Sequence, residues 1–204
     1  MAPVVVVAAG FTIKSGWASA VLLAGPAKAP AILDSRRVQL SDPEVPAAKQ
    51  PYHAGFGTAR QAGAERTRLL ASVRRFGRRS VAGLLRSHAS GRAICGVGVV
   101  VGSLIDPAEI ANDHIRIHAL EGQLFRGIVI DTAQKLGLPF TIWRERDLYT
   151  AAATALKQSD AVLRRRIAAL GEDVESGWRA EQKCAALAAW MVLARGGVWV
   201  GSGS

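Results

Sequence analysis

Three side chains, His114, His118 and Glu121, have the types and the spacing that metal binding or acid–base chemistry requires. On a helix with about 100° per residue, this spacing places them within about 60° of one another. Two imidazoles one turn apart beside a carboxylate can bind zinc or exchange protons with a substrate. Apolar residues share this face, so a hydrogen-bonded histidine pair inside the core is the alternative. The metalloprotease motif, in which Glu follows the first His directly, is absent, and we expect no bound metal and no cofactor.

Lys14 and Glu145 complete the candidate catalytic set, because each is expected at the end of a strand on the same sheet edge. The stretch 10–16 superficially resembles a phosphate-binding loop. It lacks the second glycine before Lys14 and precedes a strand instead of a helix, so it is not a P-loop. Lys14 remains a candidate anion-binding group.

A basic amphipathic helix is predicted between Arg60 and Arg92, where nine arginines stand against one acid, Glu65. Apolar residues recur there at three-and-four spacing, which is typical of a helix with one buried face. The opposite face would carry Arg74, Arg75, Arg78 and Arg79. Such a face, in a chain of net charge +10, can bind the phosphate backbone of DNA or RNA. The alternative is that these arginines only keep an exposed helix soluble.

The stretch 42–63 is rich in Pro, Gly and Ala and is predicted to be a long surface loop. Tyr52 and His53 lie in its middle. They are candidates for stacking on a base or bonding a phosphate, or alternatively for anchoring the loop to the body.

The predicted elements are those of one α/β domain. Strands are expected over 4–9, 16–24 and 31–40, followed by the arginine helix, a strand over 94–101, a helix over 107–136 and a strand over 138–143. Asp106 and Pro107 have the order of a helix start. Three helices over 147–158, 159–170 and 180–194 would follow, with Asp147 and Ser159 as caps. We expect a mixed five-stranded sheet, three strands antiparallel and then two parallel, in a single domain over 1–200 with a flexible tail over 201–204.

The composition is globular, with 50% hydrophobic and 21% charged residues. Cys95 and Cys184 are expected to be buried thiols in a reducing compartment. No apolar run reaches the ~20 residues of a membrane-spanning helix. We therefore expect a cytoplasmic protein with no membrane partner. The sequence leaves open whether the protein forms a homodimer.

The order of elements resembles the ribonuclease H-like fold over essentially the whole chain. The segment 115–144, in which a helix ends in Gly-Leu-Pro before a strand, resembles the RuvC-type Holliday-junction resolvases, and 181–188 resembles the final helix of that family. The resemblance implies a two-metal nuclease fold with carboxylates on the first strand, the fourth strand and the last helix.

The sequence departs from that pattern at the implied carboxylates. The first strand has Ala8-Ala9-Gly10, the fourth is followed by 102–105 without an acid, and only Glu181 stands where the final-helix acid is implied. Two-metal chemistry needs several oxygen ligands around ions ~4 Å apart. We therefore expect a nucleic-acid-associated protein without an intact two-metal centre. The alternatives are a hydrolase or phosphodiesterase with a divergent His/Glu/Lys site, which His53 would join, and a structural, self-associating protein.

Overall fold

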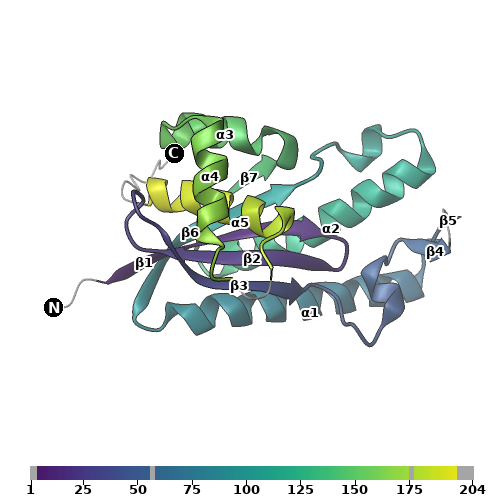
Figure 1. Ribbon diagram of the computed structural model, residues 1–204. Helices are drawn as coiled ribbons and strands as arrows, with labels where there is room; N and C mark the ends of the chain where they lie inside the picture. The colour runs from purple at the N-terminus through teal and green to yellow at the C-terminus, as the bar shows by residue number, and fades with distance from the viewer. Residues whose placement is uncertain (1–3, 56–57, 175–176, 197–204) are drawn as a thin grey trace, which may run out of the picture.

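A five-stranded mixed sheet forms the centre of the protein (Figure 1). The computed structural model describes residues 4–55, 58–174 and 177–196. The sheet has the order β3-β2-β1-β6-β7. Strands β1, β2 and β3 are antiparallel neighbours, whereas β6 runs parallel to β1 and β7 parallel to β6. The predicted α/β architecture is confirmed. The strands are β1 (Val5–Lys14), β2 (Trp17–Ala24), β3 (Ala31–Gln39), β6 (Arg92–Val101) and β7 (Phe140–Arg144).

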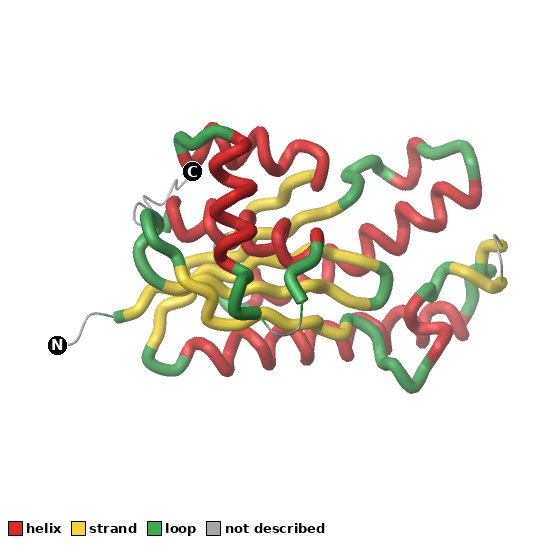
Figure 2. Tube along the Cα trace, viewed as in Figure 1, coloured by secondary structure: helices red, strands yellow, loops and turns green. Residues whose placement is uncertain are grey.

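Helices cover both faces of the sheet, so the fold has three layers (Figure 2). Two long helices pack on one face, and a group of three shorter helices packs on the other. The first pair is α1 (Ala64–Ala89) and α2 (Asp113–Lys135), and the second group is α3 (Leu148–Leu156), α4 (Asp160–Leu170) and α5 (Ala180–Arg195).

Successive side chains of the central strands lie on opposite faces of the sheet and so belong to two separate hydrophobic cores. In β1, Val7 and Phe11 point into the core under α1 and α2, while Ala8 points into the core under α5. In β6, Val99 and Val100 divide in the same way. Successive side chains on a strand face opposite sides, and a sheet with both faces covered needs apolar residues at every position. This explains why these strands read as unbroken apolar runs.

Two predicted boundaries were wrong. Strand β1 does not end at residue 9 but continues through Gly10 to Lys14. The helix predicted from residue 107 is only a single 3-10 turn, η2 (Pro107–Glu109), capped by Asp106. The α-helix proper begins at Asp113, where Oδ1 of Asn112 accepts a hydrogen bond from the Ile115 N–H. Two capping signals follow each other here, and the second one starts the long helix.

The stretch 42–63 contains short elements instead of an open loop. These are η1 (Pro46–Lys49), β4 (His53–Gly55) and β5 (Thr58–Ala59), with β4 and β5 paired antiparallel. Tyr52 is partly buried against the core under α1 and α2. The anchoring role predicted for Tyr52 fits this packing, and the hairpin brings His53 against α2.

The C-terminal helices follow their predicted limits closely. Ser159 caps α4 by accepting from the Val162 N–H, as expected. Asp147 does not cap α3. A 3-10 turn, η3 (Glu145–Asp147), precedes that helix, and the Asp147 carboxylate instead accepts from Nε of Arg144. The predicted tail over 201–204 lies outside the described residues. No helix in the described part of the chain has the length and apolarity to cross a membrane.

Candidate functional site

Three of the four histidines of the chain meet at one place. His114 and His118 stand one turn apart in the first turns of α2, and His53 comes from the start of β4. The β4–β5 hairpin lies beside the N-terminal part of α2 (Figure 1). The sequence spacing predicted that His114 and His118 lie close together, but it did not predict that His53 lies beside them.

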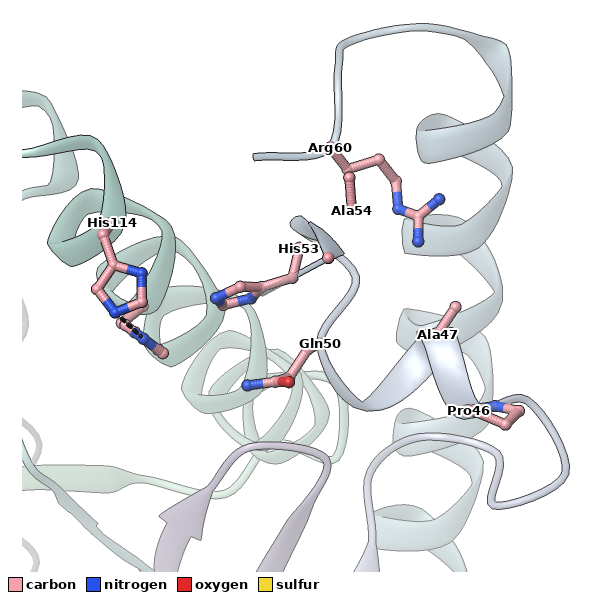
Figure 3. Close-up of a pocket in the computed structure, with 9 residues that line it drawn as sticks. Pro46, Ala47, Gln50, His53, Ala54, Arg60 and His114 are labelled. Atoms are coloured by element: carbon pink, nitrogen blue, oxygen red, sulfur yellow. Dashed lines mark hydrogen bonds between the residues drawn. The ribbon is translucent and has the colours of Figure 1, made fainter. Parts of the chain in front are cut away.

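The rings are in direct contact. Nε2 of His118 lies 3.3 Å from Nε2 of His114. The ring centroid of His53 lies 4.9 Å from that of His118 and 6.2 Å from that of His114. Figure 3 shows His53 pointing from its hairpin toward the helix that carries His114. One nitrogen from each ring lies within 4.8 Å of one nitrogen from each of the others.

Glu121 forms a hydrogen bond with His53, one of these three histidines. Its carboxylate is fully buried, and Oε1 lies 2.8 Å from Nδ1 of His53. Burial raises the pKa of Glu121, and the hydrogen bond with His53 opposes that effect. Burial also lowers the pKa of His118, helped by repulsion from His114 and His53, so the neutral imidazole is favoured there. Glu121 therefore contacts the distant His53 and not the two histidines that share its helix face.

The histidines open into a pocket of about 600 Å³. His114 and His118 line it from α2, and His53, Gln50 and Arg60 line it from the segment that precedes α1. In Figure 3, His114 lies on the α2 side and Gln50 and Arg60 on the side of that segment. His114 and His118 are exposed, whereas the His53 side chain is largely buried. The alternative of a histidine pair closed inside the core therefore does not describe His114 and His118.

Lys14 lies in a second cluster, with Glu145 and Glu181. Its Nζ is 3.6 Å from Oε2 of Glu145 and 4.0 Å from Oε1 of Glu181. Lys14 ends β1, Glu145 directly follows β7, and Glu181 is in the first turn of α5. The carboxyl ends of the parallel strands and the start of the last helix thus meet around one ammonium group.

Close packing of α5 on β1 brings Glu181 to this corner. A Cβ atom at Gly10 would lie 1.9 Å from the carbonyl oxygen of Ala185, so only glycine allows the helix to approach this near. Thr12, which is buried, donates from Oγ1 to the Glu181 carbonyl at 2.9 Å. The small residues of α5 and Gly10 together set the position of the acid.

The contacts divide the five candidate catalytic residues between two clusters. His114, His118 and Glu121 belong with His53, whereas Lys14 and Glu145 belong with Glu181. Among the described residues, no hydrogen bond or ion pair joins one cluster to the other. The single site combining all of them, as the enzyme hypothesis framed it, is not formed by these contacts.

The arginines of α1 also sort into two kinds. Arg78 donates to Asp131 of α2 at 2.6 Å and helps hold the two helices together. Arg74, Arg75 and Arg79 are exposed, as the amphipathic pattern predicted. Arg68 and Arg86, which the sequence reasoning left out, are exposed as well.

Four of these arginines form one narrow stripe. At about 100° per residue, Arg68, Arg75, Arg79 and Arg86 lie within about 40° of one another around the helix. At about 1.5 Å of rise per residue, the stripe is about 27 Å long. In the described part of the chain, none of the four has a carboxylate oxygen within 4.0 Å. We call this set the arginine stripe.

The architecture is shared with solved structures. RuvC of T. thermophilus in complex with Holliday junction substrate superposes with a TM-score of 0.54 over 93% of this chain and 94% of that chain, at 14% identity. The chain has a ribonuclease H-like fold of the RuvC type. A second structure of Thermus thermophilus RuvC gives a TM-score of 0.52 at 16% identity, with 94% and 96% of the two chains covered.

The RuvC-type fold also extends to a eukaryotic structure. The yeast mitochondrial Holliday junction resolvase Ydc2 matches at a TM-score of 0.50 and 12% identity, over 93% of this chain and 79% of that chain. No protein-family model and no curated protein matches the sequence. At these identities the likeness concerns the fold. On the strand of the RuvC-type fold where the resemblance implied a carboxylate, this chain has buried Ala8 and Ala9, and the strand ends at Lys14.

Proposed function

We propose that this protein binds duplex or branched nucleic acid through the arginine stripe and does not cleave it by two-metal chemistry. The observation that carries the proposal is the stripe itself: four exposed guanidinium groups in line, with no carboxylate partner among the described residues. An arginine paired to a neighbouring acid is already neutralised, whereas an unpaired one is available to a phosphate. The stripe matches about eight phosphate steps of one DNA strand in length.

A basic groove beside the stripe supports the assignment of nucleic-acid binding to this face. It lies between β3 and α1, has a volume of about 680 Å³, and is lined by Arg36, Arg37 and Arg79 among others. The guanidinium of Arg37 stacks over Trp17 at 4.2 Å from the ring centroid, which holds it in place. Arg36 is paired with Asp34, so Arg37 is the further cation that a phosphate backbone lying along α1 would meet there. RuvC, which shares the fold, has been solved in complex with Holliday junction substrate, so four-way junctions belong among the ligands tested.

The second half of the proposal rests on Lys14. A two-metal centre needs several carboxylates around two divalent ions. Here an ammonium group lies within 4.0 Å of both Glu145 and Glu181 and takes the place of a cation between them. Placing divalent ions beside a lysine ammonium group is electrostatically unfavourable. The Lys14 ammonium group thus already supplies positive charge to the two carboxylates, which disfavours divalent ions at this corner.

Labelled DNA duplex, RNA duplex and four-way DNA junction provide the test. Fluorescence anisotropy with 50 mM salt should give binding of at least one of them that weakens steeply with salt. The same mixtures with Mg²⁺ or Mn²⁺ should show intact strands on denaturing gels. Absence of binding to all three at 50 mM salt rejects the first half, and metal-dependent cleavage that Glu181→Gln abolishes rejects the second.

A further inference from the structure

We propose that His53, His114 and His118 bind a divalent cation of the zinc class, with Glu121 as the positioning residue for His53. The proposal goes beyond nucleic-acid binding and does not depend on it. It concerns the pocket between the β4–β5 hairpin and α2.

The distances suit a tetrahedral ion. With Zn–N bonds of about 2.0–2.1 Å, two ligands of a tetrahedron lie about 3.3 Å apart. The Nε2 atoms of His114 and His118 are 3.3 Å apart. The third nitrogen lies within 4.8 Å of both. Because the rings of His114 and His118 are exposed, small side-chain rotations can close the remaining gap without moving the backbone.

Glu121 selects which nitrogen of His53 faces the ion. In the metal-bound state the ionised carboxylate accepts the Nδ1 hydrogen, and Nε2 keeps its lone pair for the metal. Metal-binding histidines usually donate their other nitrogen to a carboxylate or a carbonyl in this way. The carboxylate is buried, and its second oxygen, Oε2, has no hydrogen-bond partner among the described residues. A buried carboxylate whose one side-chain partner is an imidazole is costly unless that imidazole carries positive charge or binds a cation.

The ligand set indicates the metal and the kind of site. Imidazole nitrogens favour Zn²⁺, Cu²⁺, Ni²⁺ and Co²⁺ over Mg²⁺ or Ca²⁺. Three histidines leave the fourth position of a tetrahedral ion free, which is the arrangement of water-activating zinc and not of structural zinc. That position would open into the pocket of about 600 Å³. The resident fourth ligand is therefore a water molecule.

Zinc titration of the full chain tests the site directly. Protein freed of metal with a chelator is titrated with Zn²⁺ against a chromophoric competitor, in the absence of nucleic acid. We expect one Zn²⁺ per chain, and Co²⁺ should give the visible absorption bands of a four- or five-coordinate ion. Glu121→Gln should weaken zinc binding about 10- to 100-fold. His114→Gln and His118→Gln should weaken it further, because each removes a ligand.

The fourth histidine supplies the matched control. His88 lies in the last turn of α1, where it is hydrogen-bonded to Asp34 of β3, and it does not line this pocket. His88→Gln should therefore bind zinc as the wild type does. His114 and His118 are exposed, so their variants should keep the wild-type circular dichroism spectrum even if Glu121→Gln does not fold. Equal zinc affinity in wild type, His114→Gln and His118→Gln overturns the proposal, as does a wild type that takes up no Zn²⁺. Neither result bears on DNA binding, which is measured separately.

Discussion

Replacing Arg75 and Arg79 with glutamine removes two of the four guanidinium groups of the arginine stripe. Both side chains are exposed and neither is paired with a carboxylate within the described residues. The fold should therefore remain intact. The variant isolates the electrostatic contribution of α1 to nucleic-acid binding.

The size of the effect follows from counterion release. Each neutralised phosphate of B-DNA contributes about −0.9 to the slope of log K against log salt. If all four arginines of the stripe contact phosphate, the stripe contributes about −3.6, so raising salt from 50 to 200 mM weakens binding roughly 150-fold. The double variant keeps two contacts, so its affinity for DNA should fall only about 12-fold between 50 and 200 mM salt.

Anisotropy titrations of labelled duplex at four or five salt concentrations give the two slopes. The control is Lys157→Asn with Arg165→Gln, which removes the same charge from the region around α4, on the opposite face of the sheet. Lys157 has φ 52°, a conformation that asparagine tolerates. The control should keep the wild-type slope. Equal slopes for the wild type and the Arg75/Arg79 variant would refute the assignment of the stripe, and a fall in both variants would point to net charge alone.

Three further outcomes are expected elsewhere in the molecule. Lys14→Asp turns an ion pair into a cluster of three acids, so Mn²⁺ should raise the melting temperature of this variant while leaving that of the wild type unchanged. Gly10→Ala should lower the free energy of unfolding by about 3 kcal/mol or more, because the new Cβ meets the Ala185 carbonyl at 1.9 Å; Gly127→Ala, with open space around its Cβ, should stabilise α2 by up to about 1 kcal/mol. Burial raises the pKa of the Cys184 thiol to about 11, so it should resist alkylation in the native state at neutral pH.

The raised pKa of Cys184 also has a consequence for stability. Between the unfolded and folded pKa values, the unfolded chain loses the thiol proton while the native state retains it. The native state then binds more protons, and stability falls as pH rises from 9 to about 11. The slope from this one group is at most about 1.4 kcal/mol per pH unit. Urea denaturation at several pH values should show that the free energy of unfolding falls less steeply above pH 9 in Cys184→Ala than in the wild type. The same pH dependence in both proteins would contradict a buried neutral thiol.

The strand and helix order was predictable because each element leaves a short-range pattern. The apolar run in β6, the arginine-bearing periodicity of α1 and the Ser159 cap of α4 all depend on neighbours within a few residues. The boundary errors also have physical causes. Glycine is common where strands end, but Gly10 lies inside β1, where its missing side chain makes room for α5. Asp106 and Asn112 are both capping residues, and only the second begins a long helix.

The site was only half predictable for a related reason. Helical spacing placed His114 and His118 together, since one turn separates them. It could not place His53, whose position depends on the β4–β5 hairpin, nor show that Glu121 turns toward His53. One signal was available: only four histidines occur in the chain, and one of them stands in the long segment before α1.

The sequence by itself determined the α/β class, the order of strands and helices along the chain, the basic character of α1 and the absence of acids from the first strand. Those properties follow from local periodicity and composition. Only the tertiary structure decided that three histidines form a trio with a buried carboxylate and that Lys14 lies between Glu145 and Glu181. It also decided that, within the described parts of the chain, the four arginines of the stripe have no carboxylate partner while Arg78 binds Asp131. These arrangements join segments far apart in the chain. Their geometry is set by how closely helices pack on the sheet, which no local pattern encodes.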